Sequence, residues 1–569
     1  MNKGHSTVVD YQRLRFDYRP APELGGDADL VHPVVIVGAG PVGLAAAIDL
    51  AQQGVSVTLV DNDDALSVGS RALCFSKRTL EIFDRLGCGQ RMVDKGVGWN
   101  VGKVFLQDEL LYTFDLLPES GYGRPAFVNL QQYYVEGYLV ERAAECENIE
   151  IRWKSEVVAL EQHGDHVVLL VDTPDGRYAM NARYVIAADG ARSAVRRALG
   201  LESHGRTFKD RFLIADVRMK APFPAERWFW FDPPFHRNQS VLLHQQPDGV
   251  WRIDFQLGWD ADPVVEKEPD RVIPRVQALL GEGVEFELEW VSVYTFSCLR
   301  MERFRHGRVL FAGDAAHGVS PFGARGANSG IQDTDNLAWK LRLVLNGQAP
   351  ETLLDSYASE REYAADENIL NSTRATDFIT PKSAVSRLFR DATLGLAKRC
   401  PFARRLVNSG RLSVPAVLRE SALNTPDRAG DGFAGDVVPG AVMPDAPMRT
   451  PGGPAWFLQL IARHAFTGVY FCEAAQDPAQ TLMRLQAPTR NAIPMRAVVV
   501  VAPGTAMPAG PLPEGVAVAE DVEGLLARRL DARPGSFYLV RPDQHLCARW
   551  REYAETDAIA ALNRAICNG

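Results

Sequence analysis

Three glycines and one aspartate near the N-terminus have the types and spacing of a dinucleotide-binding turn. Gly38, Gly40 and Gly43 form G-x-G-x-x-G, and Asp61 follows at about the 20-residue distance expected of a ribose ligand. The first glycine permits a tight turn, the second lets backbone approach a pyrophosphate, and the third lets a helix pack closely on the sheet. The helix N-terminus would then face the phosphates. The alternative is a glycine-rich packing turn that binds no nucleotide.

The segments around these residues are the ones that such a turn needs. Residues 34–37 form a continuous apolar run typical of a strand buried on both faces, and 56–60 predicts a second strand. Between them, 44–53 has helical composition and Gly54 can end the helix. A lone glycine motif is weak evidence, but this setting makes it strong. We therefore expect a Rossmann-like α/β fold.

Asp189 stands where a second ligand contact could arise. It follows a predicted buried strand at 184–188 and precedes a helix that begins near Ser193. A carboxylate at the C-terminal end of a strand lies on the edge of an open α/β sheet where ligands bind. The alternative is a simple turn.

Asp314 stands at the end of another predicted buried strand, at 308–313. The Gly/Pro-rich loop at 313–326 then leads into a helix predicted over 327–345. A second glycine loop therefore precedes a second helix N-terminus, which can stabilise negative charge that develops on a ligand. The Asp314 carboxylate could accept a ligand hydroxyl.

Length and composition indicate a large globular chain. Its 569 residues suggest about three to four domains, and 46% apolar with 23% charged residues is ordinary. The net charge of −9 favours neither nucleic acid nor an anionic membrane surface, and no apolar run predicts a transmembrane helix. Eight dispersed cysteines without CxxC indicate reduced cytoplasmic thiols rather than disulfides or a metal site. The N-terminus lacks the apolar core of a signal peptide.

Two later regions differ in composition from the α/β body. Residues 206–299 are β-rich and aromatic, which predicts an antiparallel sheet inserted into the body as one wall of an apolar cavity. Residues 380–430 predict helical segments interrupted by prolines. After residue 430 a Pro/Gly-rich stretch marks a boundary, and the following strands and short helices predict a small α/β domain.

The glycine motif, the Asp189 block and the Asp314 loop, in this order and spacing, resemble the class A flavoprotein monooxygenases. The likeness is greatest to the phenol hydroxylase and 3-(3-hydroxyphenyl)propionate hydroxylase branch. It covers residues 34–375, and 431–569 is similar to that branch's thioredoxin-like domain through YLVRPDQHLCARW. The resemblance implies an N-terminal extension (1–32), a Rossmann-like FAD-binding domain (33–205 and 300–375), an inserted mixed or antiparallel β-sheet substrate domain (206–299), a helical linker (376–430) and a thioredoxin-like C-terminal domain (431–569).

The resemblance also assigns residues to FAD. They are Gly38, Gly40, Gly43, Asp61, Arg71, Gln132, Val157, Asp189, Arg192, Asp314, Pro321, Gly326, Ala327 and Asn328. The glycines would hold the ADP half, Asp61 its ribose and Arg71 the pyrophosphate, although spacing alone allows Arg71 to be a surface arginine. Gln132 would lie beside the flavin and Asp314 would hold the ribityl chain. Pro321 and the start of the predicted 327–345 helix would lie at the isoalloxazine ring.

Asp189 and Arg192 match a motif that the family links to both FAD and NAD(P)H. Two departures from the family pattern stand out. The loop that is usually GGQG is GARG here, so that Arg325 adds a charge near the expected flavin. The C-terminal segment lacks CxxC, and thioredoxin-type redox chemistry is therefore not expected there.

The resemblance implies an NAD(P)H-dependent aromatic hydroxylase. NADPH or NADH would reduce FAD transiently, O2 would form a C4a-hydroperoxide on the flavin, and its distal oxygen would pass to a phenolic ring. His244, Arg252 and Tyr294, with Pro321, are the candidate catalytic or substrate-side residues. We expect a small aromatic substrate, a cytoplasmic location, a possible homodimer, and no metal, nucleic-acid or membrane partner. The alternatives are a flavin dehydrogenase or reductase, a Baeyer–Villiger oxygenase on the same fold, and a nucleotide-binding regulator or scaffold.

Overall fold

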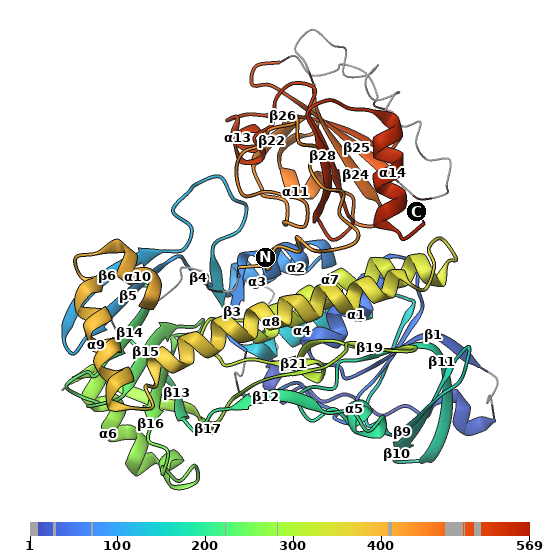
Figure 1. Ribbon diagram of the computed structural model, residues 1–569. Coiled ribbons are helices and arrows are strands. Elements are labelled where there is room, and N and C mark those ends of the chain that lie inside the picture. The colour runs from blue at the N-terminus through green and yellow to red at the C-terminus, as the bar shows by residue number, and fades with distance from the viewer. Residues whose placement is uncertain are drawn as a thin grey trace, which may run out of the picture.

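The computed structural model describes residues 10–26, 30–69, 72–221, 223–281, 283–407, 412, 414–472, 493, 495–505, 512 and 514–568. Within these ranges the chain forms one eight-stranded sheet, two seven-stranded sheets and two three-stranded sheets. The eight-stranded sheet and the first seven-stranded sheet lie at opposite ends of the molecule, with the long helix α8 running across between them (Figure 1). The second seven-stranded sheet forms a C-terminal unit above α2 and α7.

The eight-stranded sheet has the order β19-β20-β11-β1-β2-β8, and the hairpin β9–β10 extends it from β11. Its strands are β1 (Val31–Val37), β2 (Val57–Val60), β8 (Ile149–Arg152), β9 (Glu156–Gln162), β10 (Val167–Thr173), β11 (Gly176–Ala187), β19 (Arg305–His306) and β20 (Val309–Phe311). β1 pairs in parallel with β2 on one side and with β11 on the other. The strand order therefore switches direction at β1, and ligands bind beside such a point at the C-terminal strand ends.

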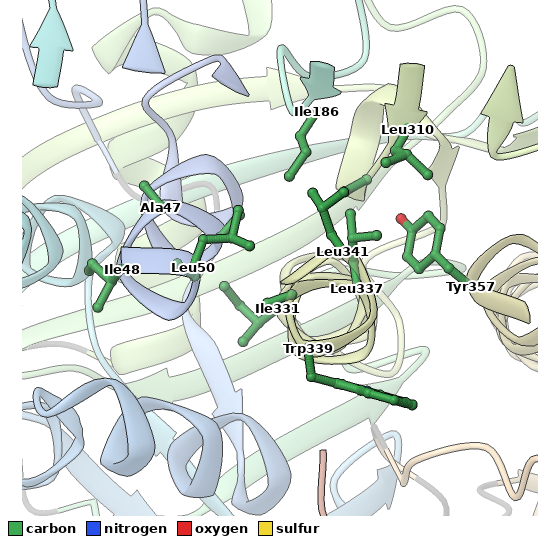
Figure 2. Close-up of a cluster of buried hydrophobic side chains, with 14 of the residues drawn as sticks. Ala47, Ile48, Leu50, Ile186, Leu310, Ile331, Leu337, Trp339, Leu341 and Tyr357 are labelled. Carbon is green, nitrogen blue, oxygen red and sulfur yellow. The ribbon is translucent and has the colours of Figure 1, made fainter. Parts of the chain in front are cut away.

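Helices α1, α7 and α8 pack in succession against this sheet. Figure 2 shows Leu50 of α1 turned toward Ile331 of α7, and Leu341 of α7 beside Leu310 of β20. Tyr357 of α8 closes the cluster, and its hydroxyl donates to the Phe311 carbonyl at 2.6 Å. The helices that surround the sheet are α1 (Pro41–Gln52), α2 (Lys77–Leu86), α3 (Gly89–Lys95), α4 (Gln132–Ala144), α5 (Ala194–Ala198), α7 (Gly326–Leu345) and α8 (Leu353–Ile379). α7 is thus a central, nearly fully buried element.

The first seven-stranded sheet has the order β17-β13-β16-β15-β14-β5-β6. Its strands are β5 (Val101–Leu106), β6 (Glu109–Asp115), β13 (Arg211–Met219), β14 (Arg227–Phe231), β15 (Ser240–Gln245), β16 (Val250–Leu257) and β17 (Phe286–Tyr294). All pairs are antiparallel except β14 with β5. The sheet is therefore mixed, and residues 101–115 join a sheet that sequence patterning indicated only within 206–299.

The two faces of this sheet differ in chemistry. One face is apolar and packs on α6 (Pro269–Leu280) through residues such as Leu213, Ile253 and Phe255. The opposite face carries charged and aromatic side chains that alternate with these along each strand, as strand geometry requires. Trp251 and Phe255 are core residues here.

Two three-stranded sheets connect the larger ones. One consists of β3 (Cys74–Ser76), β7 (Phe127–Asn129) and β4 (Val97–Trp99), and the other of β12 (Ser203–Thr207), β18 (Ser297–Met301) and β21 (His317–Gly318). The short 3-10 turns are η1 (Tyr11–Arg13), η2 (Pro22–Gly25), η3 (Val265–Lys267) and η4 (Gly313–Ala315). α9 (Ala384–Ala397) and α10 (Pro401–Val407) follow α8, whereas the described residues from 414 to 430 contain no helix.

The C-terminal sheet has the order β23-β22-β26-β25-β24-β27-β28. Its strands are β22 (Pro447–Thr450), β23 (Gly453–Trp456), β24 (Phe466–Phe471), β25 (Met495–Val501), β26 (Val516–Asp521), β27 (Phe537–Val540) and β28 (Leu546–Trp550), and its helices are α11 (Phe457–Leu460), α13 (Leu525–Leu530) and α14 (Glu555–Ala565). β24, β25 and β26 run parallel, whereas β27 and β28 are antiparallel to their neighbours.

A buried ionic cluster joins this C-terminal unit to α7 and α8. Both Glu360 oxygens accept from the Arg541 guanidinium, at 2.6 and 3.0 Å, and Lys340 Nζ lies 2.8 Å from Glu360. All three side chains are at most 1% exposed. The two cations hold the pKa of Glu360 low against the effect of burial. Removing one charge from such a cluster leaves the others without compensation.

Residues 10–26 of the N-terminal extension pack on the body. Tyr11 is buried beside Gly137 of α4, and its hydroxyl donates to Glu141 at 2.5 Å. Phe16 stacks on Trp153 at 4.2 Å between ring centroids. This part of the extension therefore packs on the chain's own body.

Three features are absent from the described part of the chain. None of its helices is long and apolar enough to cross a membrane. No cluster of His, Cys, Asp or Glu there has the arrangement of a metal site. All eight cysteines are described, and none of them forms a disulfide with another.

We expect Glu360→Gln to lower the stability of the protein, because buried Lys340 would lose its ion-pair partner and buried Arg541 would keep only Asp543. Breaking a buried pair in this way costs about 3–5 kcal/mol. The urea midpoint, followed by tryptophan fluorescence, should fall. Glu523→Gln, at an exposed position, is the control, and equal midpoints for the two variants would contradict the role given to the cluster.

Candidate functional site

The first glycine loop, between β1 and α1, is packed as tightly as its motif requires. Gly38 has φ +106°, and a Cβ there would lie 2.5 Å from the Ala188 carbonyl oxygen. A Cβ on Gly43 would lie 1.9 Å from the Gly38 oxygen. A Cβ on Gly40, in contrast, would meet nothing within 4 Å. Two glycines therefore close the turn, while the third leaves open space above the backbone.

That open space lies at the start of α1, where Gly40 is the N-cap residue and no side chain caps the helix. Amide groups of the first turn have no partner within the helix and can bind an anion. Asp61 lies beside this turn, and its two oxygens accept from the Ala39 amide at 2.5 Å and the Asp63 amide at 2.8 Å. Burial raises the pKa of Asp61. A carboxylate has about four acceptor sites, so capacity for a ligand hydroxyl remains.

The second glycine loop meets the first one directly. Val42 in the first turn of α1 would lie 3.0 Å from a Cβ on Gly313 and 2.7 Å from a Cβ on Gly330 of α7. Such short distances mean that only glycine fits at either position without a shift. The N-terminal part of α1, the turn η4 after β20 and the first turns of α7 therefore converge on one place.

A buried carboxylate on α7 fixes this convergence. Asp333 accepts from the Gly313 amide at 3.0 Å, from the Arg361 guanidinium at 2.7 Å, and is 2.7 Å from His317 Nε2. The side chains of His317, Arg361 and Asp333 are at most 3% exposed. Charge from His317 and Arg361 lowers the pKa of Asp333 against the effect of burial. Sequence analysis did not identify Asp333, although a run of polar residues inside a buried helix is a signal that could have done so.

Asp314 lies beside Gly313 in η4 and is exposed at the C-terminal end of β20. It lies on the same sheet edge as the first glycine loop, and its contact to a ligand hydroxyl stays a prediction.

The N-terminus of α7 is linked to the small sheet that contains β3. Asn328 donates to the Cys74 carbonyl at 2.8 Å and accepts from the Ser76 amide at 2.9 Å. Gly326 and Ala327 are partly exposed and Pro321 is exposed. The Arg325 guanidinium is buried and donates to Asn368 of α8 at 3.0 Å, so the charge that the GARG loop adds is directed toward α8.

Asp189 lies on the same edge of the sheet as the first glycine loop. One of its oxygens accepts from the Val195 amide at 3.1 Å, and the other is buried without a hydrogen-bond partner in the described part of the chain. Arg192 is exposed. An unpaired buried acceptor is costly unless a ligand satisfies it, and this oxygen therefore points to a bound hydroxyl or amide.

Of the remaining predicted cofactor residues, the structure describes Gln132 and Val157 but not Arg71. Gln132 accepts from the Ala72 amide at 2.9 Å and donates to Glu136 at 2.7 Å, which braces the loop before β3. Val157 is buried on β9 and pairs with Val171 of β10. Arg71 lies outside the described residues.

The three predicted substrate-side residues come together on the polar face of the first seven-stranded sheet. Arg252 pairs with His244 across β16 and β15, and Tyr294 extends the same face on β17. Arg252 donates to both oxygens of Asp216, at 2.8 and 2.9 Å. Sequence analysis missed Asp216 and Asp254, each an acid at an inward-facing position of an otherwise apolar strand.

This polar face lies against the flavin-side loops. His244 Nδ1 is 3.8 Å from Cys74 Sγ, and Cys74 is the residue that Asn328 bonds at the start of α7. A Cβ on Gly69 would lie 2.3 Å from the Trp290 ring. Burial, then Arg227 and Arg252, lower the pKa of His244, and burial raises the pKa of Tyr294. Both side chains are therefore uncharged near neutral pH.

The loops fit a flavin dinucleotide. Space above Gly40, an uncapped helix N-terminus, the Asp61 carboxylate and the unpaired Asp189 oxygen suit a ribose and a diphosphate. The second loop and the α7 N-terminus follow along the same edge, next to the polar sheet face. The chain thus offers groups for a dinucleotide along one sheet edge, with the polar sheet face at one end of it.

Comparisons with known proteins agree with this geometry. A family model described as "FAD binding domain" matches residues 32–372. A 6-methylpretetramide 4-monooxygenase of Streptomyces rimosus is 32% identical over 546 residues, covering 93% of this chain and 92% of that protein. A 3-(3-hydroxy-phenyl)propionate/3-hydroxycinnamic acid hydroxylase of Klebsiella pneumoniae is 32% identical over 395 residues, covering 68% of this chain and 70% of its own.

Among solved structures, the flavin-dependent monooxygenase PieE, in complex with FAD and substrate, has a TM-score of 0.77 at 23% identity. The match covers 95% of this chain and all of that one, and at this identity it supports the fold. The chain therefore belongs to the FAD-binding family of flavin-dependent aromatic monooxygenases, and it is a flavoenzyme.

Proposed function

We propose that this enzyme hydroxylates a phenolic substrate with NADPH or NADH as reductant and O2 as oxidant. The observation that carries the proposal is the meeting of the two glycine loops at Val42, next to a sheet face that presents His244, Arg252 and aromatic rings. The two loops would thus bind a flavin dinucleotide, and the sheet face beside its ring would present side chains suited to binding a substrate.

The chain's own residues bind and orient FAD. The α1 N-terminus would hold the diphosphate, Asp61 the adenosine ribose, and Asp314 the ribityl chain. The amides at Gly326, Ala327 and Asn328 would face the isoalloxazine ring, where the positive end of α7 favours negative charge. Bound FAD would supply the redox chemistry that reduces O2. The protein supplies position and excludes water.

The finer organisation forms part of the same proposal. We assign 33–205 with 300–375 to the FAD-binding domain, 206–299 together with the β5–β6 hairpin to the substrate domain, and 431–569 to a thioredoxin-like domain. The parallel β24–β25–β26 core with antiparallel β27 and β28 supports the last assignment. The absence of CxxC from the sequence gives this domain a structural role.

An oxygen-labelling experiment tests the function. The purified holoprotein is incubated with NADPH or NADH, a panel of phenols and 18O2, and the products are analysed by mass spectrometry. We expect phenol-stimulated oxidation of the nicotinamide and one labelled oxygen in the product. Stimulated oxidation with an unlabelled product would instead identify a dehydrogenase or reductase.

We expect Asp314→Ala to reduce the FAD content of the purified protein at least tenfold, because a partner of the ribityl chain is lost. FAD is quantified by absorbance after release from the protein. Asp175→Ala, in an exposed turn, should retain full FAD. Full FAD content in the Asp314 variant would sink the proposed ribityl role.

Gly40→Val should give a folded protein that does not retain FAD. The backbone at Gly40 has φ −73°, which valine adopts readily, and its side chain would enter the open space assigned to the diphosphate. Circular dichroism should match the wild type while the bound flavin spectrum is lost. Gly164→Val is the matched control, because Gly164 also faces open space but lies far along the chain in another turn. A fully FAD-loaded Gly40 variant would refute the assignment.

A further inference from the structure

The polar face of the first seven-stranded sheet contains a compact set of charged side chains. Register places Arg227, His244, Arg252 and Asp216 in one row across β14, β15, β16 and β13. Asp254 lies two residues from Arg252 on β16 and therefore points to the same side. We call these five residues the polar row. Each is at most 8% exposed.

The polar row lies next to the position proposed for the flavin ring. Cys74 Sγ is 3.8 Å from His244 Nδ1, and the Cys74 thiol is within electrostatic range of Arg227, Arg252 and Asp254. The Cys74 carbonyl accepts from Asn328 at 2.8 Å. A single residue therefore separates the polar row from the start of α7.

Two atoms of the polar row are available to a ligand. His244 Nε2 is buried without a hydrogen-bond partner among the described residues. The Asp254 carboxylate makes no hydrogen bond within the described part of the chain, in contrast to Asp216, whose oxygens are both used by Arg252. Burial raises the pKa of Asp254 to about 6, with Arg252 opposing the shift, so this carboxylate is ionised at neutral pH and can accept a hydroxyl proton in a hydrogen bond.

The protonation state of Cys74 bears on whether His244 Nε2 donates or accepts a hydrogen bond. Burial raises the pKa of the Cys74 thiol to about 11, so the S–H group is intact and can donate to His244 Nδ1. In the tautomer in which the thiol donates to Nδ1, His244 carries its proton on Nε2 and is a donor to a ligand oxygen.

The charges of the polar row already compensate one another. Arg227 and Arg252 contribute two positive charges, Asp216 and Asp254 contribute two negative ones, and His244 is neutral. A carboxylate added to this set would give the buried row a net negative charge, which is unfavourable. An uncharged ring oxygen meets no such penalty.

Aromatic side chains border the polar row. Phe212, in register with Tyr294 on the same sheet face, contacts Phe322 of the glycine loop edge to face at 4.8 Å between ring centroids, and Phe296 contacts the same ring at 5.6 Å. Flat apolar surfaces beside two hydrogen-bonding groups suit an aromatic ring with oxygen substituents.

We propose that the polar row selects an uncharged phenol with a second ring substituent that accepts a hydrogen bond, and that it excludes aromatic acids. Asp254 accepts the phenolic O–H, and His244 Nε2–H donates to the second substituent. This inference rests on the hydroxylase function proposed above. It identifies the substrate class and two binding residues.

Two ligands of equal size but different charge test whether charge, rather than shape, decides binding. The holoprotein is titrated with 3-hydroxybenzamide and with 3-hydroxybenzoate at pH 7.5, and the dissociation constants are taken from the difference spectrum of bound FAD. Resorcinol is added as a smaller uncharged phenol. We expect the benzamide and resorcinol to bind at least tenfold more tightly than the benzoate.

Asp254→Asn reverses the charge argument without changing the size of the side chain. The variant retains two guanidinium groups against one carboxylate, so the preference for benzamide over benzoate should fall at least tenfold. FAD content and circular dichroism should match the wild type, because Asp254 makes no hydrogen bond to the described protein. Asp175→Asn is the control and should leave the preference unchanged.

The outcomes separate this inference from the function on which it rests. The inference would be overturned if the wild type bound the benzoate equally or more tightly, or if Asp254→Asn kept the same preference. Phenol-stimulated oxidation with a labelled product would then still support the hydroxylase. If phenols of neither charge perturbed the flavin or stimulated oxidation, the proposed function and the inference would fall together.

Discussion

The structure depends on a close approach between two helix N-termini. Val42 on α1 fits against Gly313 and Gly330 with no room for a side chain on either glycine. Asp333 maintains this approach, because it binds the Gly313 amide and the buried His317 and Arg361 at once. Both helix starts therefore reach the same sheet edge, and a single dinucleotide can contact both.

The regular elements of the FAD-binding half were predictable from the sequence, because each has a strong local signal. Apolar runs identified β1, β2 and β20, and the glycine spacing placed the turn before α1 within a few residues. The N-terminus of α7 followed from its glycine-rich loop and helical periodicity. These features depend on the chain's immediate neighbourhood, which a sequence displays directly.

Other features could not be predicted because they arise between distant segments. The pairing of β14 with β5 brings residues more than a hundred positions apart into one sheet. Asp216 and Asp254 stand in apolar strands, and their roles become visible only when partners from other strands surround them. His244, Arg252 and Tyr294 were predicted as individual residues, whereas their common face follows from strand register.

The anchoring of the C-terminal unit has a consequence for how this protein can be shortened or recombined. Lys340 and Glu360 belong to the helices that carry the flavin-side residues, yet the second cation that pairs with Glu360, Arg541, comes from the far end of the chain. Trp339 likewise packs edge to face on Phe466 of the C-terminal sheet. If the gene were cut after the FAD-binding half, charged groups and an indole would be exposed on the helices that shape the catalytic centre. C-terminal segments can therefore be exchanged between homologues only together with the helix faces that match them.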